Sequence, residues 1–367
     1  MIGRRACLAG GLALPLLTGA RGPEESPLRL EVASLPEAVR CGGRTIATYE
    51  LTLWNFGTEE LLIDRVSAHD PQSAELFAAE GPALAGRMVT PGPFHGARRL
   101  PYGRIATIYL EVPLPASAPA SLTHIVTYRE RMVPATIAMA PVPVDTSPIP
   151  VLDAPLKDGP WVAVHAPDWP RGHRRVIYAV GQPRIPGRLA IDFVRVDEAG
   201  LTARGDTDVP SNALGYGAEV LAVADGRVVE VRDGMAESRS VKGNPKHTQG
   251  DAAGNFVSLD IGGGRFAIYE HLKPGSITVK PGDMVRTCQV IGALGFSGDT
   301  TGPHLHFHVA DAPMPLLGEG KGFVFSAYEQ LGAYADLATL GSKQWVATRE
   351  DGPRTGERPA SNSVVRF

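Results

Sequence analysis

The stretch TGPHLHFHV, residues 301–309, places three histidines on alternate positions of a short apolar segment. Successive side chains of a β-strand point to opposite faces, so His304, His306 and His308 would share one face while the residues between them enter a core. Neutral imidazole binds zinc and exchanges protons near neutral pH. The segment therefore predicts a half-buried strand whose polar face forms a metal site or a catalytic site. A purely solvated polar face is the plainer alternative.

The composition favours a two-domain protein made of strands and turns. The chain has 367 residues, 42 of them glycine and 32 proline, with a formal net charge of −3. That length favours two domains. Alternating runs separated by Gly and Pro, with few helical patterns, predict an all-β fold. The small negative charge offers no basic surface, so we do not expect nucleic acid as a partner.

The N-terminus has the features of a secretory signal peptide, which we predict over residues 1–20. Arg4 and Arg5 precede an apolar run from Ala6 to Leu17 that is too short to span a bilayer comfortably, and small residues follow up to Ala20. A retained N-terminal anchor is the alternative. Nothing later resembles a transmembrane helix, so we expect a periplasmic or secreted protein with no membrane span after signal removal.

Two cysteines lie beyond this segment. Cys41 and Cys288 fall in different proposed domains. They could pair in an oxidising compartment, but two cysteines so far apart in sequence do not establish a bridge. We expect two separate buried thiols.

Residues 27–140 are predicted to form an immunoglobulin-like β-sandwich. In TYELTLWN, residues 48–55, Tyr49, Leu51 and Leu53 would share one face and the residues between them the other. LLIDRV, IATIYLEV and THIVTYRERM repeat this alternation between turns. No catalytic cluster is evident in this region. Residues 141–160 contain six prolines, which predicts a stiff extended linker.

The second domain, predicted over residues 161–327, is also rich in strand patterns. Asp-Gly and Gly-Gly pairs separate its apolar runs, as in hairpin turns. Only FSAYEQLGAYADL, residues 325–337, has a helical pattern. Residues 328–367 are therefore predicted to hold a C-terminal helix and a disordered tail.

Two further segments of this domain carry residues suited to chemistry. Asp192, in RLAIDF, is a carboxylate embedded in an apolar strand pattern. It could simply start a turn, but a carboxylate in that setting needs a partner, and a metal would supply one. His271, in IYEHLKPGS, lies at a strand end before a turn. The glycine-rich stretch GALGFSGDTTGP, residues 292–303, leads into the histidine strand.

From about Asp192 to Val309 the sequence resembles the lysostaphin-type, LytM-like zinc metallopeptidases, which are peptidoglycan endopeptidases. The segments AIDF, LAVADGRVVEV, YEHLKPGSITVKPGDMV and GFSGDTTGPHLHFHV follow the order and spacing of that family. The resemblance implies a LytM-like antiparallel β-sheet domain, Zn²⁺ as the cofactor and peptidoglycan peptides as the substrate. It does not extend to the first domain.

The resemblance also implies roles for individual residues. Asp192 and His306 would be zinc ligands. His271 and His304 would flank the attacking water and the scissile carbonyl, as general base and transition-state stabiliser. These roles suit the residue types, because a neutral histidine can accept a proton from an attacking water.

One position departs from the family pattern. The ligand histidine expected four residues before Asp192 is Arg188 here, and arginine stays protonated and cannot bind zinc. His173, in PRGHRRVIY, is the first candidate for the third metal ligand, because its segment could fold back beside the Asp192 strand. His165 and His247 are weaker candidates, and so is His308, which shares the face of His306 but lies two residues further along.

The sequence therefore predicts an exported zinc metalloendopeptidase that cleaves peptide cross-links of bacterial peptidoglycan. The alternative is a degenerate, non-catalytic LytM-like domain that regulates cell-wall hydrolases through cell-wall protein partners. A carbohydrate-binding or wall-binding module is a third interpretation. It would need exposed aromatic platforms, and the four tryptophans of the chain argue against it.

Overall fold

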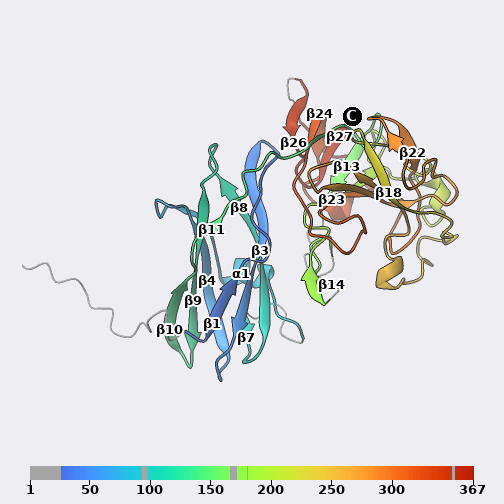
Figure 1. Ribbon diagram of the computed structural model, residues 1–367. Helices are drawn as coiled ribbons and strands as arrows, with labels where there is room; N and C mark the ends of the chain where they lie inside the picture. Colours follow the sequence, from blue (N-terminus) through green and yellow to red (C-terminus); the bar gives the residue numbers. More distant parts are fainter. Residues whose placement is uncertain (1–25, 93–97, 166–171, 180, 349–351) are drawn as a thin grey trace, which may run out of the picture.

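The computed structural model describes residues 26–92, 98–165, 172–179, 181–348 and 352–367 (Figure 1). Within these ranges the chain forms many strands, one short α-helix and three 3-10 turns, so the all-β prediction is confirmed. The predicted signal peptide, residues 1–20, lies outside the described residues. In the described part of the chain, no helix combines the length and the apolar character needed to cross a bilayer.

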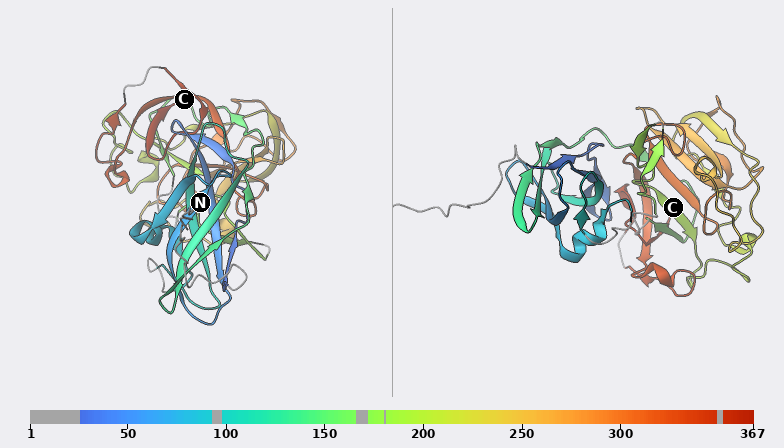
Figure 2. Two further views of the ribbon diagram at one scale, coloured as in Figure 1. Left: turned by 90° about the vertical axis from the view of Figure 1, so that its left-hand side faces the viewer. Right: turned by 90° about the horizontal axis from the view of Figure 1, so that it is seen from below.

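Residues 28–143 form two antiparallel sheets that pack around one core, and we call them the N-terminal sandwich (Figures 1 and 2). The arrangement is compatible with an immunoglobulin-like sandwich. The first sheet has the order β1-β3-β8-β6, with β2 on β3; the second has the order β10-β9-β4-β5, with β7 on β4 and β11 on β9. The bounds are β1 Leu28–Glu31, β2 Ala38–Cys41, β3 Arg44–Asn55, β4 Leu61–His69, β5 Glu75–Glu80, α1 Gly81–Arg87, β6 Met88–Val89, β7 Arg99–Leu100, β8 Ile105–Leu114, β9 Ser121–Glu130, β10 Val133–Ala138 and β11 Val142–Pro143.

Strand β3 shows how the alternation of the sequence builds the sandwich core. Tyr49, Leu51 and Leu53 all point inward, with exposures of 1%, 0% and 0%. Glu50 lies between them on the outer face, where a lone sandwich would expose it to solvent. It is nevertheless buried, at 7% exposure. The outer face of β3 is therefore covered by another part of the chain.

Residues 151–367 are built on one twelve-stranded sheet, which we call the C-terminal sheet (Figure 1). Its order is β12-β24-β27-β13-β16-β23-β20-β19-β18-β21, with β25 and β26 on β24. Two small two-stranded sheets, β14-β15 and β17-β22, flank it. The bounds are β12 Val151–Leu152, β13 Trp161–Val164, β14 Ile177–Ala179, β15 Gln182–Arg184, β16 Ile191–Arg195, η2 Pro210–Asn212, β17 Glu219–Leu221, β18 Gly226–Arg232, η3 Gln249–Asp251, β19 Asn255–Asp260, β20 Phe266–Leu272, β21 Met284–Val285, β22 Val290–Ala293, β23 Leu305–Ala310, β24 Val324–Ala333, η4 Leu337–Thr339, β25 Val346–Ala347, β26 Arg354–Glu357 and β27 Ser363–Arg366.

The central strands of this sheet bury an apolar face and turn their polar residues to the other side. Ile191 and Phe193 of β16, with Leu305 and Phe307 of β23, have 0% exposure and belong to one core. Because side chains alternate along a strand, the residue between each pair points away from that core. This alternation places Asp192 and His306 together on the opposite face of the sheet.

The proline-rich segment 141–160 pairs with both parts of the protein. Val142 and Pro143 pair with β9 of the sandwich, and Val151 and Leu152 pair in parallel with β24 of the C-terminal sheet. Two short strands within the segment thus belong to the two sheets that it connects. The domain bounds drawn from the sequence stay predictions.

The predicted C-terminal helix and disordered tail are wrong for the described residues. Residues 324–333 form β24, which pairs with β12, β26 and β27. Strand β27 lies inside the sheet between β24 and β13, and its Val364 and Val365 have 0% exposure. Pairing on both edges and burial of Phe325 and Tyr328 outweigh the weak helical pattern of this segment.

Cys41 and Cys288 are both free thiols, as expected. The expectation that both are buried is wrong, because Cys288 is exposed. Its backbone adopts a φ of 65° in a turn where the Gln289 amide donates to the Arg286 carbonyl. A residue at such a turn tip projects from the surface instead of packing into a core.

A buried histidine of the sandwich makes its stability depend on pH. The Tyr49 hydroxyl lies 2.7 Å from Nε2 of His124, and burial, with a smaller effect of His69, lowers the pKa of His124 to about 4. In the unfolded chain His124 binds a proton below about pH 6.5, whereas in the folded protein it stays neutral down to about pH 4. The sandwich should therefore lose about 3 kcal/mol of unfolding free energy between pH 6.5 and 4.

Hydrogen exchange of the β9 amides measures this loss directly. We expect a His124→Gln variant, which keeps an acceptor for Tyr49, to be less sensitive to acid by that amount. An equal pH dependence in the parent and the variant would show that His124 is protonated in the folded protein.

Candidate metal centre

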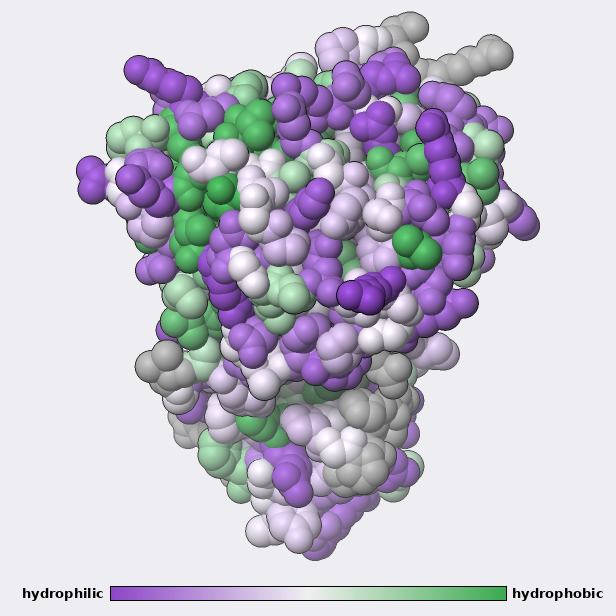
Figure 3. Space-filling model, turned by 90° about the vertical axis from the view of Figure 1, so that its right-hand side faces the viewer, coloured by the Kyte–Doolittle hydropathy of each residue, from purple (hydrophilic) through white to green (hydrophobic). Residues whose placement is uncertain are grey.

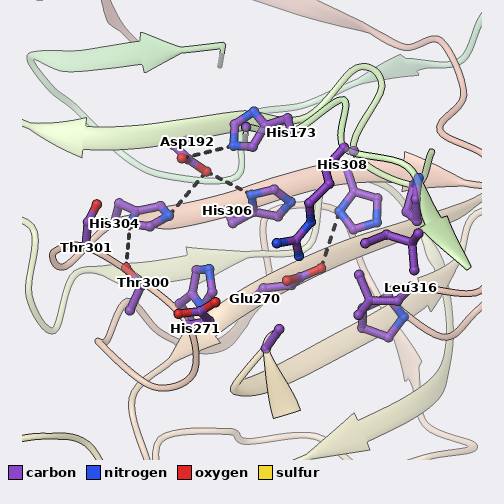
Figure 4. Close-up of a pocket in the computed structure, with 18 of the residues that line it drawn as sticks. His173, Asp192, Glu270, His271, Thr300, Thr301, His304, His306, His308 and Leu316 are labelled. Carbon is purple, nitrogen blue, oxygen red and sulfur yellow. Dashed lines mark hydrogen bonds and ion pairs between the residues drawn. The ribbon is translucent and has the colours of Figure 1, made fainter. Parts of the chain in front are cut away.

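Three neighbouring strands bring the candidate residues together from distant parts of the sequence. Asp192 on β16 lies directly opposite His306 on β23, and His306 lies opposite Glu270 on β20. His304 precedes β23 and His271 lies near the end of β20. All five therefore gather on the polar face of the C-terminal sheet (Figure 4).

Asp192 is at the centre of this group and contacts three histidines (Figure 4). Its Oδ1 lies 2.8 Å from Nδ1 of His306 and 3.2 Å from Nε2 of His304. Its Oδ2 lies 3.0 Å from Nε2 of His173. One carboxylate thus brings together three imidazole nitrogens, two from the segment of β23 and one from the turn that carries His173.

His173 reaches this point from a turn outside the sheet. Its main chain rests on Gly187, where an added Cβ would lie 2.5 Å from the His173 carbonyl oxygen. Any larger residue at position 187 would push the turn away. The His173 ring packs edge-on against the His306 ring, with centroids 4.8 Å apart. His173 thus lies beside Asp192 and His306, as expected for a segment that folds back from upstream. Its role as a metal ligand stays a prediction.

Arg188, which takes the place of the expected family ligand, points elsewhere. Its guanidinium donates to Glu50, to Glu319 and to the Gly320 carbonyl. All of these partners are oxygen acceptors, and none of them is a candidate metal ligand. The weaker candidates His165 and His247 lie outside the clusters of metal-binding residues found in the described chain.

His271 and His304 both present Nε2 to the pocket. Nδ1 of His304 lies 2.8 Å from the Gly302 carbonyl, and Nδ1 of His271 lies 2.8 Å from the Ser297 carbonyl. A carbonyl oxygen only accepts, so each Nδ1 carries the hydrogen and each Nε2 keeps a lone pair when the ring is neutral. His271 has a φ of 62°, an uncommon conformation for a residue other than glycine and a mark of functional sites.

The pocket shifts the pKa values of its residues in opposite directions. Burial by itself raises the pKa of the Asp192 carboxyl, but His173 and His304 outweigh it and hold that pKa well below its usual value. Burial lowers the pKa of His306, yet Glu270 and Asp192 raise it to about 9 overall. Burial and the neighbouring His304 and His306 lower the pKa of His271 well below its usual value. The field that draws protons to His306 would equally favour a metal cation.

Sequence reasoning missed one buried residue of the site, Glu270, and treated His308, which is also buried, only as a weaker ligand candidate. The Glu270 carboxylate lies 3.6 Å from Nδ1 of His308, and both are close to His306. Burial raises the pKa of Glu270. A glutamate in the apolar run IYEHL, one residue before a candidate catalytic histidine, was the available signal. A carboxylate beside a ligand histidine commonly orients its ring.

The donors present fit a zinc ion. His173, Asp192 and His306 each offer one ligand atom, and these atoms lie within 4.8 Å of one another. Small side-chain adjustments would bring all three within the roughly 2 Å of a zinc–ligand bond. His271 and His304 form a second group with His306, and Glu270 and His308 form a third. His306 belongs to every group, so it is the common element of any metal site here.

These residues line an open pocket of about 370 Å³. Its rim includes Lys246, Asp299 and Thr301. Figure 3 shows one outer face of the molecule, on which hydrophilic and hydrophobic residues are interspersed and the hydrophobic ones form several separate groups. The lining of the pocket is rich in histidines and other polar or charged residues.

Comparison with known proteins finds a family match for one segment of the chain. Residues 211–316 match the profile of peptidase family M23. This confirms the resemblance to lysostaphin-type peptidases over a segment that includes His271, His304 and His306. Asp192 and His173 lie before it, so their place in the site depends on the geometry described above.

Two curated relatives match over short stretches. The peptidoglycan DD-endopeptidase ShyB of Vibrio cholerae is 34% identical over 112 residues, which cover 29% of this chain and 22% of that protein. An uncharacterized metalloprotease of Buchnera aphidicola is 30% identical over 97 residues, covering 26% of this chain and 21% of that protein. The match thus spans about a fifth of the length of each relative.

Solved structures of peptidases are also similar to this chain. The catalytic domain of lysostaphin from Staphylococcus simulans is 23% identical and covers 34% of this chain and 86% of that one, with a TM-score of 0.21. A zinc-containing peptidase from Vibrio cholerae is 15% identical and covers 80% of this chain and 85% of that one, with a TM-score of 0.27.

Proposed function

We propose that this protein is a zinc-dependent metalloendopeptidase that cleaves peptide cross-links in bacterial peptidoglycan. The observation that carries the proposal is the convergence of His173, Asp192 and His306 on one point, with His271 and His304 beside it. The M23 match over residues 211–316 and the similarity to a peptidoglycan DD-endopeptidase support the reaction and the substrate class.

His173, Asp192 and His306 would hold the zinc ion. When bound, zinc lowers the pKa of a water molecule towards neutrality and polarises a carbonyl group. Glu270 and His308 would help to orient His306, because both are buried beside it and the His306 and His308 rings pack edge-on with centroids 5.2 Å apart.

His271 and His304 would carry out the proton transfer and charge stabilisation. Each ring is oriented by an Nδ1–H donated to a carbonyl, which aims Nε2 at the space beside Asp192. A neutral Nε2 can accept the proton of the attacking water, and a protonated Nε2 can donate to the oxyanion that forms on the substrate carbonyl. The ring centroids are 4.9 Å apart, so both can act on one peptide bond.

The proposed substrate requires an exported protein. The segment from Arg4 to Ala20 supports export through its charged start and its short apolar run. We therefore propose that the mature protein acts in the periplasm or outside the cell, where it meets the cell wall.

Digestion of isolated peptidoglycan tests the proposal. Purified full-length protein is incubated with sacculi, and the released fragments are identified by mass spectrometry. We expect loss of cross-linked fragments, inhibition by a chelator and recovery on adding back zinc, because metal-site enzymes lose activity with their ion.

The opposite result has a clear meaning. Intact cross-links at every zinc concentration, from folded protein, would overturn the peptidase proposal. If the same protein then increased the activity of a separate cell-wall hydrolase, the non-catalytic regulator would become the better account.

A further inference from the structure

The N-terminal sandwich contacts the segments that carry the candidate metal ligands. Glu50 of β3 is buried, and its carboxylate bridges two arginines of the C-terminal part. One is Arg174, which directly follows His173. The other is Arg188, four residues before Asp192 and in the position where the family pattern has a ligand histidine.

Arg174 packs against the outer face of the sandwich. Its Nε and Nη2 donate to Oε1 of Glu50 at 2.9 and 2.8 Å, and Nη2 also donates to the Tyr49 carbonyl at 2.8 Å. A further ion pair joins it to Glu111, and its guanidinium lies over the Tyr109 ring. All these partners belong to β3 and β8 of the sandwich. The sandwich thus fixes the position of the residue next to His173.

Arg188 links the same carboxylate to the C-terminal part. Its Nε donates to Oε2 of Glu50 at 2.8 Å, and its Nη2 donates to Glu319 at 2.6 Å. The residue before it, Gly187, supports the main chain of His173 by direct contact. Glu50 therefore binds Arg174, which follows His173, and Arg188, which follows Gly187. Because the main chain of His173 contacts Gly187, these two bonds hold His173 close to the Asp192 strand.

The energetics favour a rigid connection. Burial by itself raises the pKa of Glu50, but Arg188 and Arg174 outweigh it and hold that pKa below its ordinary value. A buried carboxylate bound by two guanidinium groups is held by charge-assisted hydrogen bonds in a fixed geometry. Removing its charge leaves two buried arginines with one acidic partner fewer.

We propose that Glu50 is a positioning residue of the metal centre, through which the N-terminal sandwich holds His173 in place for metal binding. The proposal rests on the proposed zinc site and gives the sandwich a role in it. It also gives Arg188 a role. At the position where the family pattern has a ligand histidine, this chain has an arginine that helps to hold His173, the ligand proposed from another segment.

A matched pair of full-length variants tests this role. Glu50→Gln removes the carboxylate that anchors Arg174 and Arg188. Glu37→Gln is the control, because Glu37 is equally buried at 7% exposure and joins the same two parts of the protein through Arg265, 2.7 Å away, yet borders no candidate ligand. Zinc affinity is measured by competition with a chromogenic chelator, and folding by thermal unfolding without metal.

We expect Glu50→Gln to weaken zinc binding about 10- to 100-fold, the range found when a group that orients a metal ligand is lost. Glu37→Gln should bind zinc like the parent, even if both variants unfold at a lower temperature. Because the ligands themselves remain, saturating zinc should restore most of the peptidase activity of Glu50→Gln. If Glu50→Gln does not fold, Arg174→Lys replaces it, since lysine cannot reach both Glu50 and the Tyr49 carbonyl.

The outcomes separate this inference from the proposed function. If the parent binds zinc and cleaves peptidoglycan, but Glu50→Gln and Glu37→Gln bind zinc equally well, the positioning role is overturned and the peptidase stands. If the parent binds no zinc, the proposed function fails, and the positioning role fails with it.

Discussion

Full-length protein carrying Asp192→Ala is expected to lose zinc binding and peptidase activity together. Asp192 contacts His173, His304 and His306, so its removal deletes one proposed ligand and also the anion that gathers the others. The loss of zinc affinity should exceed about 100-fold, the upper range for losing a group that only orients a ligand. His173→Ala should have the same effect, because it too removes a ligand. Zinc titration and digestion of sacculi measure both effects.

His247→Ala is the control for these ligand variants. His247 is one of the weaker sequence candidates and lies outside every cluster of metal-binding residues in the described chain. It should keep parental zinc affinity. Undiminished zinc binding in Asp192→Ala, or loss in His247→Ala alone, would contradict the proposed ligand set.

His304→Ala is expected to separate chemistry from metal binding. His304 is not one of the three proposed ligands, but its oriented Nε2 lies beside them. Loss of a proton-transferring group typically costs a factor of about 10² to 10⁴ in rate. The variant should therefore bind zinc with near-parental affinity while its rate of cross-link cleavage falls within that range.

The same experiment can fail in an informative way. A His304→Ala variant that loses zinc would make His304 a ligand, as its group with His271 and His306 allows. A variant that retains full activity would remove His304 from the chemistry and leave His271 as the group that transfers protons.

The histidine strand could be predicted from the sequence because its information is local. The alternation in TGPHLHFHV fixes which side chains of β23 are buried, and Leu305, Phe307 and Val309 all have 0% exposure. The same reasoning placed Asp192 on a strand between two core residues. Pairing of β16 with β23 then follows from matching apolar faces, which is why the two segments meet in register.

The C-terminal strands could not be predicted in the same way. The helical pattern of residues 325–337 is weak, and its conversion into β24 depends on partners that follow more than twenty residues later. The apolar pair Val364 and Val365 is typical of a buried strand. The polar residues before this pair nevertheless favoured the prediction of a disordered tail. Long-range pairing decides such segments.

The link between Glu50 and the site was also beyond local reasoning. Glu50 is separated from Arg174 and Arg188 by 124 and 138 positions. Its place in an alternating strand predicted only that it faced away from the sandwich core. The C-terminal part of the chain covers Glu50 and buries it. Arg188, which in the sequence indicated only the loss of a ligand histidine, is one of the residues that bind it.

Zinc content of the purified full-length protein, measured by elemental mass spectrometry beside Asp192→Ala and His304→Ala, tests the central claim most directly. The account predicts close to one zinc per chain in the parent and in His304→Ala, and almost none in Asp192→Ala. A parent that stays free of zinc after loading, or an Asp192→Ala variant that keeps a full complement, would contradict it.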